Sequence, residues 1–462
     1  GWRHADSSAM STPNAGSRFS VLIHLGGGTS TVWLRNGCLD AIYMKGGASS
    51  ACMDGKLNIL LVGGGMISEE VILPTIFQER RKGKIDRVMV ATRRPRTILH
   101  LREVFPQERF EGYPDPKKLD PESSNPDCYL EALGDLKKPG VVIVATPDHL
   151  HTGVILRSIE QGFDCIVQKP LCLKTADAHA IIQKASEKAA YVYTDYHKRH
   201  DKAIRAAKYR YMRGELGEML HGHAWIEERR EMPLEVFGRW CEQSSPFEYI
   251  GVHYVDAYYF ITGLKPVRVI GFGQKRFLPA KGKDAFDAVQ AVIEWEGGSV
   301  LFVQTSWILP QSNPNLTNQG LQLTGTEGTY SANHADRNCN FVTTKRGVET
   351  YNPYFFKPFP DWDKPESAEW AGYGGDSLVQ PIDDILRICA RTRGLPAARA
   401  KAVRLRMLRS LRKVRPLPEQ ALIGTAVNEA VRLSIAQGSA PVFFDDSMVP
   451  RMTAGKEESV EP

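Results

Sequence analysis

A glycine-rich turn between an apolar run and a helical run is the feature that most constrains the fold of this chain. Residues 57–64 (LNILLVGG) form a compact apolar run, which is typical of a buried parallel strand. Residues 68–83 (SEEVILPTIFQERRKG) have a helical pattern, with Ser68 as the expected N-cap. A strand, a glycine turn and a helix in this order predict the first unit of a nucleotide-binding α/β domain.

The turn has the spacing G-x-G-x-x-small, met by Gly63, Gly65 and Ser68. The first glycine permits a tight turn, the second lets a pyrophosphate approach the backbone, and the small third residue allows the helix to pack closely on the strand. Met66 and Ile67 open the helix, whose N-terminal N–H groups would face the phosphates. We therefore predict a dinucleotide site at this turn.

The sequence predicts further strands at residues 86–94, 140–147 and 164–170, and a helix at residues 151–163. Strand and helix alternate through this part of the chain. This alternation is the pattern of a Rossmann-type, doubly wound parallel sheet.

The pattern changes after about residue 180. The β-rich runs there are residues 221–229, 266–277, 287–308, 320–332 and 339–347, and a late helix is expected at residues 419–438. Turn signals separate the β-rich runs and no helix is expected between them, so we predict an α+β domain with a mainly antiparallel open sheet.

These patterns divide the chain into four parts. We expect a disordered extension at residues 1–55, a dinucleotide-binding domain at 56–180, a substrate and oligomerisation domain at 181–445, and a tail at 446–462. The extension contains three consecutive glycines, but no helical pattern follows them, so they are not read as a second phosphate loop.

The end of the second strand indicates which cofactor is bound. NAD sites place Asp or Glu there to bind the ribose 2′-hydroxyl, whereas this chain has Thr92, Arg93 and Arg94. An arginine pairs with a 2′-phosphate, which an acid would repel. We therefore predict NADP as the cofactor, with NAD as the alternative; a solvated strand end is the structural alternative for the two arginines.

Four segments in the middle of the chain carry a longer motif. Residues 145–178 (ATPDHLHTGVILRSIEQGFDCIVQKPLCLKTADA) contain a Thr-Pro-x-x-x-His turn and then, after one helix and one strand, a Lys-Pro dipeptide. Residues 193–201 (YTDYHKRHD), 214–219 (GELGEM) and 249–263 (YIGVHYVDAYYFITG) follow in order. Together they resemble the glucose–fructose oxidoreductase/inositol dehydrogenase (Gfo/Idh/MocA) family.

The resemblance implies specific roles. Lys169 and His253 would be the catalytic pair that handles the hydroxyl proton, while the nicotinamide exchanges the hydride. The residues expected to border the cofactor are Thr146, Pro147, His151, Gln168, Lys169, His197 and Arg199, with His151 supporting the cofactor turn. A lysine just past the carboxyl end of a strand also suits the place where open α/β sheets hold ligands.

Two positions depart from the family pattern. Gln168 stands where the family has a glutamate before the lysine, and Tyr249 stands where it has an aspartate four residues before the histidine. The adjacent Glu248 would point elsewhere if the segment is helical. Tyr249 could donate a proton beside Lys169; alternatively the chain uses another substrate or has lost activity.

These features favour an NAD(P)-dependent oxidoreductase that acts on a sugar, polyol or related hydroxyl or carbonyl compound. Two alternatives remain open: an NAD-dependent glycoside hydrolase that works by transient oxidation, and a catalytically silent nucleotide-binding regulator. Net turnover of the nicotinamide would separate the first from the others.

A basic segment stands apart from the rest of the chain. Residues 391–415 carry ten Lys or Arg and no acid, and without them the net charge of +6 becomes −4. The basic balance is therefore local, and no nucleic-acid partner is expected. The apolar residues Val403, Met407, Leu411 and Val414 fall along one helical face. We expect a solvated insertion at 391–416, with a helix that binds an acidic partner or a membrane surface as the alternative.

Composition sets the remaining expectations. No run of about 18 apolar residues occurs, so no membrane span is expected. The eight cysteines form no CxxC pair, which argues against a zinc site or a disulfide framework and for a reduced, cytoplasmic protein. We expect a small-molecule substrate and no metal, and the family resemblance implies a homo-oligomer that uses the sheet of the second domain.

Overall fold

The computed structural model describes residues 20–21, 32–33, 55–363 and 368–453. The chain divides into two compact units, Gly1–Cys52 and Met53–Pro462. In the first unit, β1 (Ser20–Val21) pairs antiparallel with β2 (Val32–Trp33). The rest of the expected extension at 1–55, except Gly55, and the end of the expected tail lie outside the described residues.

The second unit begins with a six-stranded parallel sheet in the order β5-β4-β3-β6-β7-β8. Its strands are β3 (Leu57–Val62), β4 (Ile85–Ala91), β5 (Glu111–Tyr113), β6 (Gly140–Val144), β7 (Asp164–Gln168) and β8 (Val192–Asp195). Every pairing is parallel, which confirms the predicted Rossmann-type sheet. The strand order reverses between β3 and β6, and ligands bind at such a switch point in open α/β sheets.

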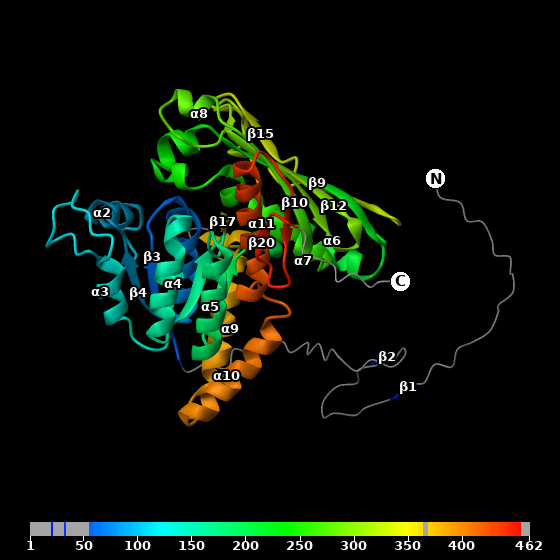
Figure 1. Ribbon diagram of the computed structural model, residues 1–462. Coiled ribbons are helices and arrows are strands. Elements are labelled where there is room, and N and C mark those ends of the chain that lie inside the picture. Colours follow the sequence, from blue (N-terminus) through cyan, green and yellow to red (C-terminus); the bar gives the residue numbers. More distant parts are fainter. Residues whose placement is uncertain (1–19, 22–31, 34–54, 364–367, 454–462) are drawn as a thin grey trace, which may run out of the picture. The chain divides into compact units, whose positions relative to one another are not determined.

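Helices cover both faces of this sheet (Figure 1). One face carries α1 (Leu73–Arg81), α2 (Pro95–Val104) and α9 (Tyr373–Thr392), and the other carries α3 (Cys128–Asp135), α4 (His151–Glu160) and α5 (Thr175–Lys188). Within β3, Ile59 packs toward the first set of helices, while Leu60 packs toward the second. Because both faces are buried, the strand is buried at every position, as the apolar run in the sequence suggested.

The second sheet has eight strands in the order β14-β13-β9-β12-β11-β10-β19-β20. They are β9 (Met219–Arg229), β10 (Pro266–Gln274), β11 (Ala288–Trp295), β12 (Val300–Leu309), β13 (Thr317–Gly325), β14 (Thr329–Asn333), β19 (Val442–Phe444) and β20 (Pro450–Arg451). All pairings are antiparallel except β9 with β12. The mainly antiparallel sheet is confirmed, with one parallel pair that joins strands separated by a long crossover.

The expectation that no helix separates the later strands is wrong. A π-helical turn, η6 (Phe247–Gly251), and α7 (Val252–Thr262) lie between β9 and β10. Val252 to Tyr258 are all buried, so this helix lacks the polar face that produces a helical period. The short α8 (Phe277–Ala280) lies between β10 and β11.

The remaining helices and strands lie outside the two large sheets. They are α6 (Lys202–Met212), α10 (Ala397–Leu411), α11 (Pro418–Ala436), the hairpin β15 (Asn340–Thr343) with β16 (Gly347–Thr350), and the pair β17 (Lys357–Pro360) with β18 (Ala368–Ala371). Short 3-10 or π-helical turns are η1 (Ser68–Ile72), η2 (Asp148–Leu150), η3 (His197–His200), η4 (Met232–Val236), η5 (Trp240–Gln243) and η7 (Glu296–Gly298).

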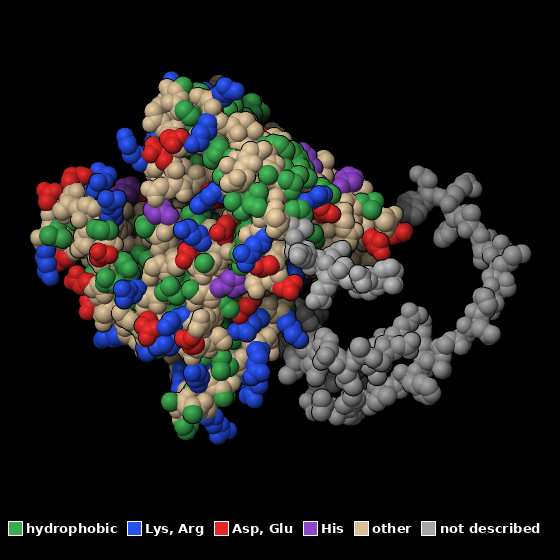
Figure 2. Space-filling model, in the orientation of Figure 1, with side chains coloured by type: hydrophobic (Ala, Val, Ile, Leu, Met, Phe, Trp, Pro, Cys, Tyr) green, Lys and Arg blue, Asp and Glu red, His purple; other side chains and the backbone are tan. Residues whose placement is uncertain are grey.

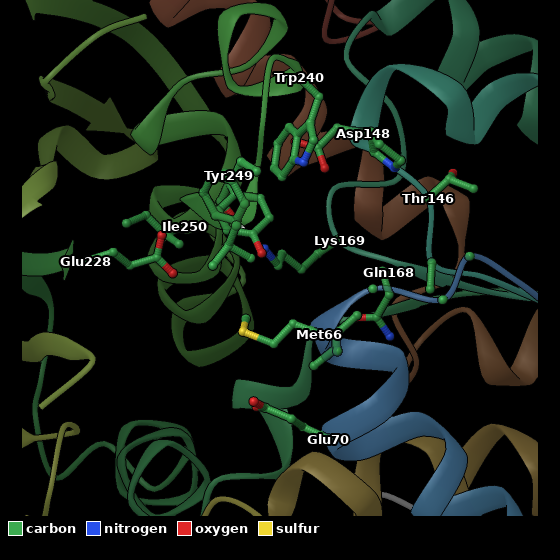
Figure 3. A pocket seen from close by; sticks show the side chains of 18 of the residues that line it. Met66, Glu70, Thr146, Asp148, Gln168, Lys169, Glu228, Trp240, Tyr249 and Ile250 are labelled. Atoms are coloured by element: carbon green, nitrogen blue, oxygen red, sulfur yellow. Dashed lines mark hydrogen bonds between the residues drawn. The ribbon is translucent and has the colours of Figure 1, made fainter. Parts of the chain in front are cut away.

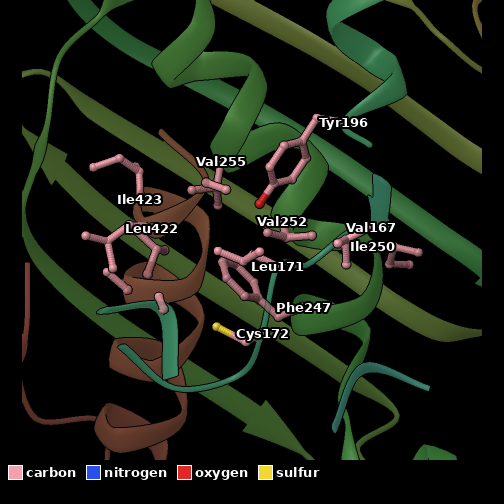
Figure 4. Close-up of a cluster of buried hydrophobic side chains, with 14 of the residues drawn as sticks. Val167, Leu171, Cys172, Tyr196, Phe247, Ile250, Val252, Val255, Leu422 and Ile423 are labelled. Carbon is pink, nitrogen blue, oxygen red and sulfur yellow. The ribbon is translucent and has the colours of Figure 1, made fainter. Parts of the chain in front are cut away.

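A continuous apolar core joins the two domains of this unit (Figure 4). Leu171, in the loop after β7, packs with Val252 of α7 and Leu422 of α11. A Cβ at Gly424 of α11 would lie 2.5 Å from the Tyr196 hydroxyl, so glycine allows the helix its close approach there. The walls of any cleft between the domains are therefore held by buried packing.

The basic segment is part of the fold. It contains α10, and Lys and Arg side chains gather over this helix at the bottom of Figure 2. Leu408 is 3% exposed, and Met407 and Leu411 pack against the core of the parallel sheet. The expectation of a solvated insertion is therefore wrong for this face of the helix, although Val414 is exposed as a solvated residue would be.

Two arginines of the segment form ion pairs with buried acids of the chain. Arg404 bonds to Asp164, and Arg415 Nε donates to Asp384 Oδ2 at 2.7 Å. Both carboxylates are almost completely buried. Part of the basic charge thus meets acidic partners within the protein.

Candidate active site

A cavity of about 1330 Å³ lies where the two domains meet. The predicted site residues that line it are Gly63, Gly65, Met66, Ile67, Thr92, Arg93, Arg94, Thr146, Pro147, Gln168, Lys169, His197, Tyr249 and His253. His151 and Arg199 are not among its lining residues. A typical small-molecule site occupies about 300–1,000 Å³, so this cavity has room for a cofactor and a substrate together.

The glycine turn lies at one end of the cavity. Gly63 has a φ of +113°, and a Cβ there would lie 2.1 Å from the Ala145 carbonyl oxygen, so only glycine fits between β3 and β6. No atom lies within 4 Å of the place a Cβ would take at Gly65, which leaves open space in front of the turn. This is the cradle that a pyrophosphate would fill.

Ser68 is not the helix N-cap. The amides of Ser68 and Glu69 already donate to the Gly65 carbonyl, at 2.9 and 3.1 Å, so helical turns begin before Ser68. The Ser68 hydroxyl instead donates to the Gly63 carbonyl at 3.0 Å. The small side chain thus holds the turn closed from within the helix.

The end of β4 presents cations and no carboxylate. Thr92 Oγ1 donates to the Arg94 carbonyl at 2.9 Å, and Arg93 Nε donates to Ser124 Oγ at 2.8 Å. Arg94 Nε is buried without a hydrogen-bond partner. An N–H donor left unpaired beside the cavity is suited to an anionic ligand.

His151 lies behind the cavity and ties two loops together. Its Nδ1 lies 2.8 Å from the Pro170 carbonyl oxygen, and its Nε2 lies 2.9 Å from that of Thr146. Burial lowers the pKa of His151 and outweighs the two carbonyl acceptors, which raise it. The ring holds the Thr146 turn against the residue that follows Lys169.

Lys169 follows β7 and is 9% exposed. Its Nζ lies 3.8 Å from the centre of the Tyr249 ring and donates a hydrogen bond to the Tyr249 carbonyl oxygen. Figure 3 shows its side chain reaching from the first domain toward Tyr249 of the second. Burial lowers the pKa of this lysine, which favours exchange of a proton near neutral pH.

Three buried carboxyl groups act on Lys169: Asp148, Asp195 and Glu228. Burial raises the pKa of Asp148 and Asp195 to about 6 and that of Glu228 to about 7, and Lys169 opposes each shift. Asp148 accepts a hydrogen bond from Ser244 at 3.0 Å. The lysine therefore has acidic neighbours even though the family's glutamate is absent.

Sequence reasoning missed these three acids. One signal was available for Glu228: it alternates with Ala224 and Ile226 on β9, so it is an acid in line with apolar residues of the buried face. Gln168 holds one of these acids, since its Nε2 donates to Asp195 Oδ2 at 2.8 Å. The residues next to Gln168 in the sequence gave no sign of this contact.

Aromatic side chains surround Tyr249. Its ring centre lies 4.9 Å from Phe237, 5.3 Å from Trp240 and 6.2 Å from Trp307. Burial raises the pKa of Tyr249 well above its usual value, and Glu228 and Asp148 raise it further. The phenol therefore stays protonated at neutral pH, and the aromatic wall offers a flat apolar surface to a ligand.

The rings of His197 and His253 pack against each other in the cavity wall, with centres 4.4 Å apart and planes tilted by 45°. Burial lowers the pKa of both well below the usual value, so both rings are neutral near pH 7. His253 Nδ1 is buried without a partner. The helical arrangement around Tyr249 also sends Glu248 away from the cavity, where it pairs with Arg432.

Arg199 lies outside the cavity lining and has a structural pairing. Its guanidinium donates to both oxygens of Asp256, at 2.8 and 2.7 Å, and both side chains are buried. This bidentate pair ties η3 to α7. In the part of the chain that the structure describes, no group of three or more His, Cys, Asp or Glu is placed to hold a metal, and none of the described helices is long and apolar enough to cross a membrane.

The glycine cradle, the arginines and the switch-point cavity define a two-domain protein with a dinucleotide-binding Rossmann fold. Residues 57–196 match the model described as "Oxidoreductase family, NAD-binding Rossmann fold", and residues 204–331 match that of the GFO/IDH/MocA C-terminal domain. The two matches cover more than half of the sequence. The chain belongs to the Gfo/Idh/MocA family.

Two curated relatives are similar to part of the chain. The scyllo-inositol 2-dehydrogenase (NAD(+)) of Bacillus subtilis is 25% identical over 198 residues, which are 42% of this chain and 55% of that protein. The 2,7-anhydro-N-acetylneuraminate hydratase of Mediterraneibacter gnavus is 24% identical over 217 residues, 42% of this chain and 57% of that protein. The chain thus spans little more than half the length of these relatives.

A solved structure extends the likeness of the fold. The inositol dehydrogenase homologue from Azotobacter vinelandii, complexed with NADH and myo-inositol, has a TM-score of 0.60 and 17% identity. The superposition covers 85% of this chain and 98% of that one. At 17% identity, this similarity shows that the two proteins share a fold.

Proposed function

We propose that this protein is an NAD(P)-dependent dehydrogenase or reductase that transfers a hydride between a nicotinamide and a hydroxyl-bearing carbon of a sugar or polyol. The observation that carries the proposal is the position of Lys169. It extends into the cavity between the Gly63 turn and the aromatic wall of the second domain, with a pKa lowered by burial. The names of the relatives, an inositol dehydrogenase among them, support the substrate class.

Different residues would bind the cofactor, transfer the proton and exclude water. The open space at Gly65 and the cations at the end of β4 would hold the phosphates, and a bound nicotinamide would supply the hydride acceptor. Lys169 would accept the hydroxyl proton, and the neutral His253, which lines the cavity, would hydrogen-bond the reacting oxygen. The aromatic wall would exclude water and stack on the ring of the substrate.

Within this proposal the cofactor is NADP. Arg93 and Arg94 line the cavity, and the strand end that holds them carries no acid that would repel a 2′-phosphate. The relatives whose names print a cofactor are named for NAD or NADH, so NAD is the alternative to be measured beside it.

The test is a turnover assay with both oxidised cofactors and a panel of inositols, pyranoses and glycosides. The absorbance of reduced nicotinamide should rise with at least one polyol, and Lys169→Met should slow the rise by about 10²–10⁴-fold. Tight cofactor binding with no turnover in either direction on any compound would contradict the proposal and favour a silent regulator.

A second candidate is a reaction without net change of the cofactor. The relative named as a hydratase supports it, because adding water across a bond requires no net oxidation. The glycoside hydrolase predicted as an alternative belongs to the same class. Product analysis by mass spectrometry, with reduced nicotinamide followed in parallel, distinguishes the two: a converted substrate without accumulated reduced cofactor identifies this second class.

We further propose that the chain forms a homo-oligomer through the second sheet, in a reducing compartment such as the cytoplasm. The face of that sheet opposite α7 and α11 presents Trp225, Val292 and Phe302, which are only partly buried, and Phe272, which is 41% exposed. The six cysteines that the structure describes are all unpaired, which supports reducing conditions. Phe302→Glu should reduce the mass measured by sedimentation, whereas Arg399→Glu on α10 should not.

A further inference from the structure

Glu228 is a buried acid on β9 that lines the cavity together with Lys169 and Tyr249. It is 6% exposed and follows Ala224 and Ile226 along the buried face of the strand. Figure 3 shows the Glu228 carboxylate and the Lys169 amine directed toward the same region of the cavity, from different domains. A carboxylate in an apolar strand position needs a reason, because burying it costs free energy.

Trp307 on β12 fixes the orientation of this carboxylate. The indole Nε1 donates to Glu228 Oε2 at 3.0 Å. Glu228 Oε1 has no hydrogen-bond partner in the described part of the chain, and it is not among the polar atoms sealed from solvent. One oxygen is therefore held, and the other is available to a proton from the cavity.

The charged and titratable groups that act on Glu228 come from other elements: Lys169 lies after β7 and Tyr249 on η6. Two further acids, Asp148 on η2 and Asp195 at the end of β8, act on the same lysine. Burial raises the pKa of Glu228 to about 7, and the lysine lowers it in part. Among the acids and bases near Lys169, Tyr249 is too weak an acid and His253 too weak a base to change charge near neutrality. The two aspartates have pKa values of about 6, but Asp148 already accepts a hydrogen bond from Ser244, and Asp195 has one oxygen bound by Gln168 and the other sealed from solvent.

We propose that Glu228 is the relay residue through which Lys169 exchanges the proton of the reacting hydroxyl with solvent. The inference rests on the proposed function. A bound oxidised nicotinamide would take up the C–H hydrogen with its electron pair, and the electron pair of the O–H bond would then form the carbonyl π bond. The released proton would pass to the neutral Lys169 amine, then from the ammonium through water in the cavity to Glu228 Oε1, and finally to solvent. Reduction runs through the same residues in reverse.

The assignment explains how the site works with Tyr249 in place of an acid. The carboxylate comes from a strand of the second sheet and not from the helical segment that carries His253. Glu228 acts through Lys169 and stabilises neither the cofactor turn nor the arginines. Its loss should therefore affect proton transfer and leave cofactor binding intact.

The central variant is Glu228→Gln. The amide oxygen still accepts the Trp307 hydrogen bond, but the side chain no longer titrates. We expect kcat to fall at least about tenfold, the limb of the pH profile near neutrality to disappear, and KM and cofactor affinity to change little. Glu228→Asp should keep the limb with an intermediate kcat. Glu327→Gln, at an exposed turn of the same sheet and outside the cavity lining, is the control and should resemble the wild type.

A second readout needs no turnover. In the cofactor-free protein, infrared difference spectra across pH should show a carboxyl group that titrates near pH 7 and is absent in Glu228→Gln. In Lys169→Met its pKa should rise, because the neighbouring cation is removed. The relay is overturned if Glu228→Gln leaves kcat and the pH profile unchanged. It is also overturned if Lys169→Met leaves the pKa of Glu228 unchanged. If the wild type shows no nicotinamide turnover at all, the proposed function fails, while the infrared titration still decides whether the two residues are coupled.

Discussion

The Lys169 ammonium lies 3.8 Å from the centre of the Tyr249 ring and donates a hydrogen bond to the carbonyl oxygen of the same residue. A single residue of the second domain thus supports the lysine of the first domain through both its ring and its backbone. The aromatic face attracts the charged form of the lysine, whereas burial favours the neutral form. Tyr249, which stands where the family pattern has an aspartate, therefore contacts the lysine through an uncharged ring and a backbone carbonyl.

This relationship predicts that the ring of Tyr249 matters more than its hydroxyl. In Tyr249→Phe the ring remains, so kcat should fall by a factor of about 2–5 at most, the range of a cation–π difference of about 0.5–1 kcal/mol. Tyr249→Leu removes the ring and should reduce turnover further and shift the pH profile. Steady-state kinetics on both variants checks this. A large loss of kcat in Tyr249→Phe would contradict this prediction and indicate that the phenol donates a proton.

Lys169→Met should lower kcat by about 10²–10⁴-fold, the usual range for a lost acid–base group. Cofactor affinity, measured by fluorescence titration, should stay close to that of the wild type because the phosphates are held at the other end of the cavity. Lys174→Met, at an exposed lysine of the same loop, is the matched control. Wild-type turnover in Lys169→Met would remove the lysine from the mechanism.

The buried carboxyl groups predict how stability depends on pH. The folded-state pKa values of Asp148 and Asp195 are raised to about 6 and that of Glu228 to about 7, above their ordinary values. A raised carboxyl pKa stabilises the fold at low pH, and that contribution is lost as the pH rises through the folded value. The free energy of unfolding of the wild type should therefore decline as the pH rises from about 5 to about 8. Glu228→Gln should make this decline smaller, by on the order of 2 kcal/mol. Urea unfolding at several pH values measures it; parallel curves for variant and wild type would contradict it.

Arg93→Asp should weaken NADP binding more than NAD binding, because a carboxylate at this strand end repels a 2′-phosphate and can bind a ribose hydroxyl. Arg94→Asp should act in the same direction. Dissociation constants for both cofactors provide the measurement, and Arg399→Asp on α10 controls for the change in net charge. Equal or tighter binding of NAD by the unaltered protein would refute the preference for NADP.

Arg415→Met should destabilise the fold by about 3–5 kcal/mol, since it leaves the buried Asp384 carboxylate without its principal cation. Tyr191 also donates to this carboxylate, at 3.1 Å, so the loss should propagate into the parallel sheet. Arg399→Met on the exposed side of α10 should be nearly neutral. Thermal and denaturant unfolding of both variants measure the change in stability. Equal losses in the two variants would show that the ion pair between Arg415 and Asp384 does not stabilise the fold.

The sequence alone predicted the features that depend on local pattern. Gly63 is recognisable because a strand, a tight turn and a helix are contiguous, and the structure gives it the positive φ that such a turn requires. The apolar strand at Leu57–Val62 was equally clear, since burial on both faces leaves a continuous run.

Contacts between distant segments could not be predicted in this way. The pairing of Glu228 with Trp307 joins β9 to β12, and neither residue has a neighbour in sequence that reveals the other. The helix at 252–262 was missed because burial on all sides erases its period. The basic segment was misread because its partners, Asp164 and Asp384, lie elsewhere in the chain.

The return of α9 and α10 to the first sheet has a consequence for how the protein is made. One face of the nucleotide-binding sheet is closed by residues 373–417, which follow the β-rich core of the second domain in the chain. During synthesis the ribosome therefore releases β7 and β8 long before α9, which packs on them. Tyr191 and Tyr193 lack the residues of α9 over that interval, so the nascent first domain exposes apolar surface that chaperones can bind.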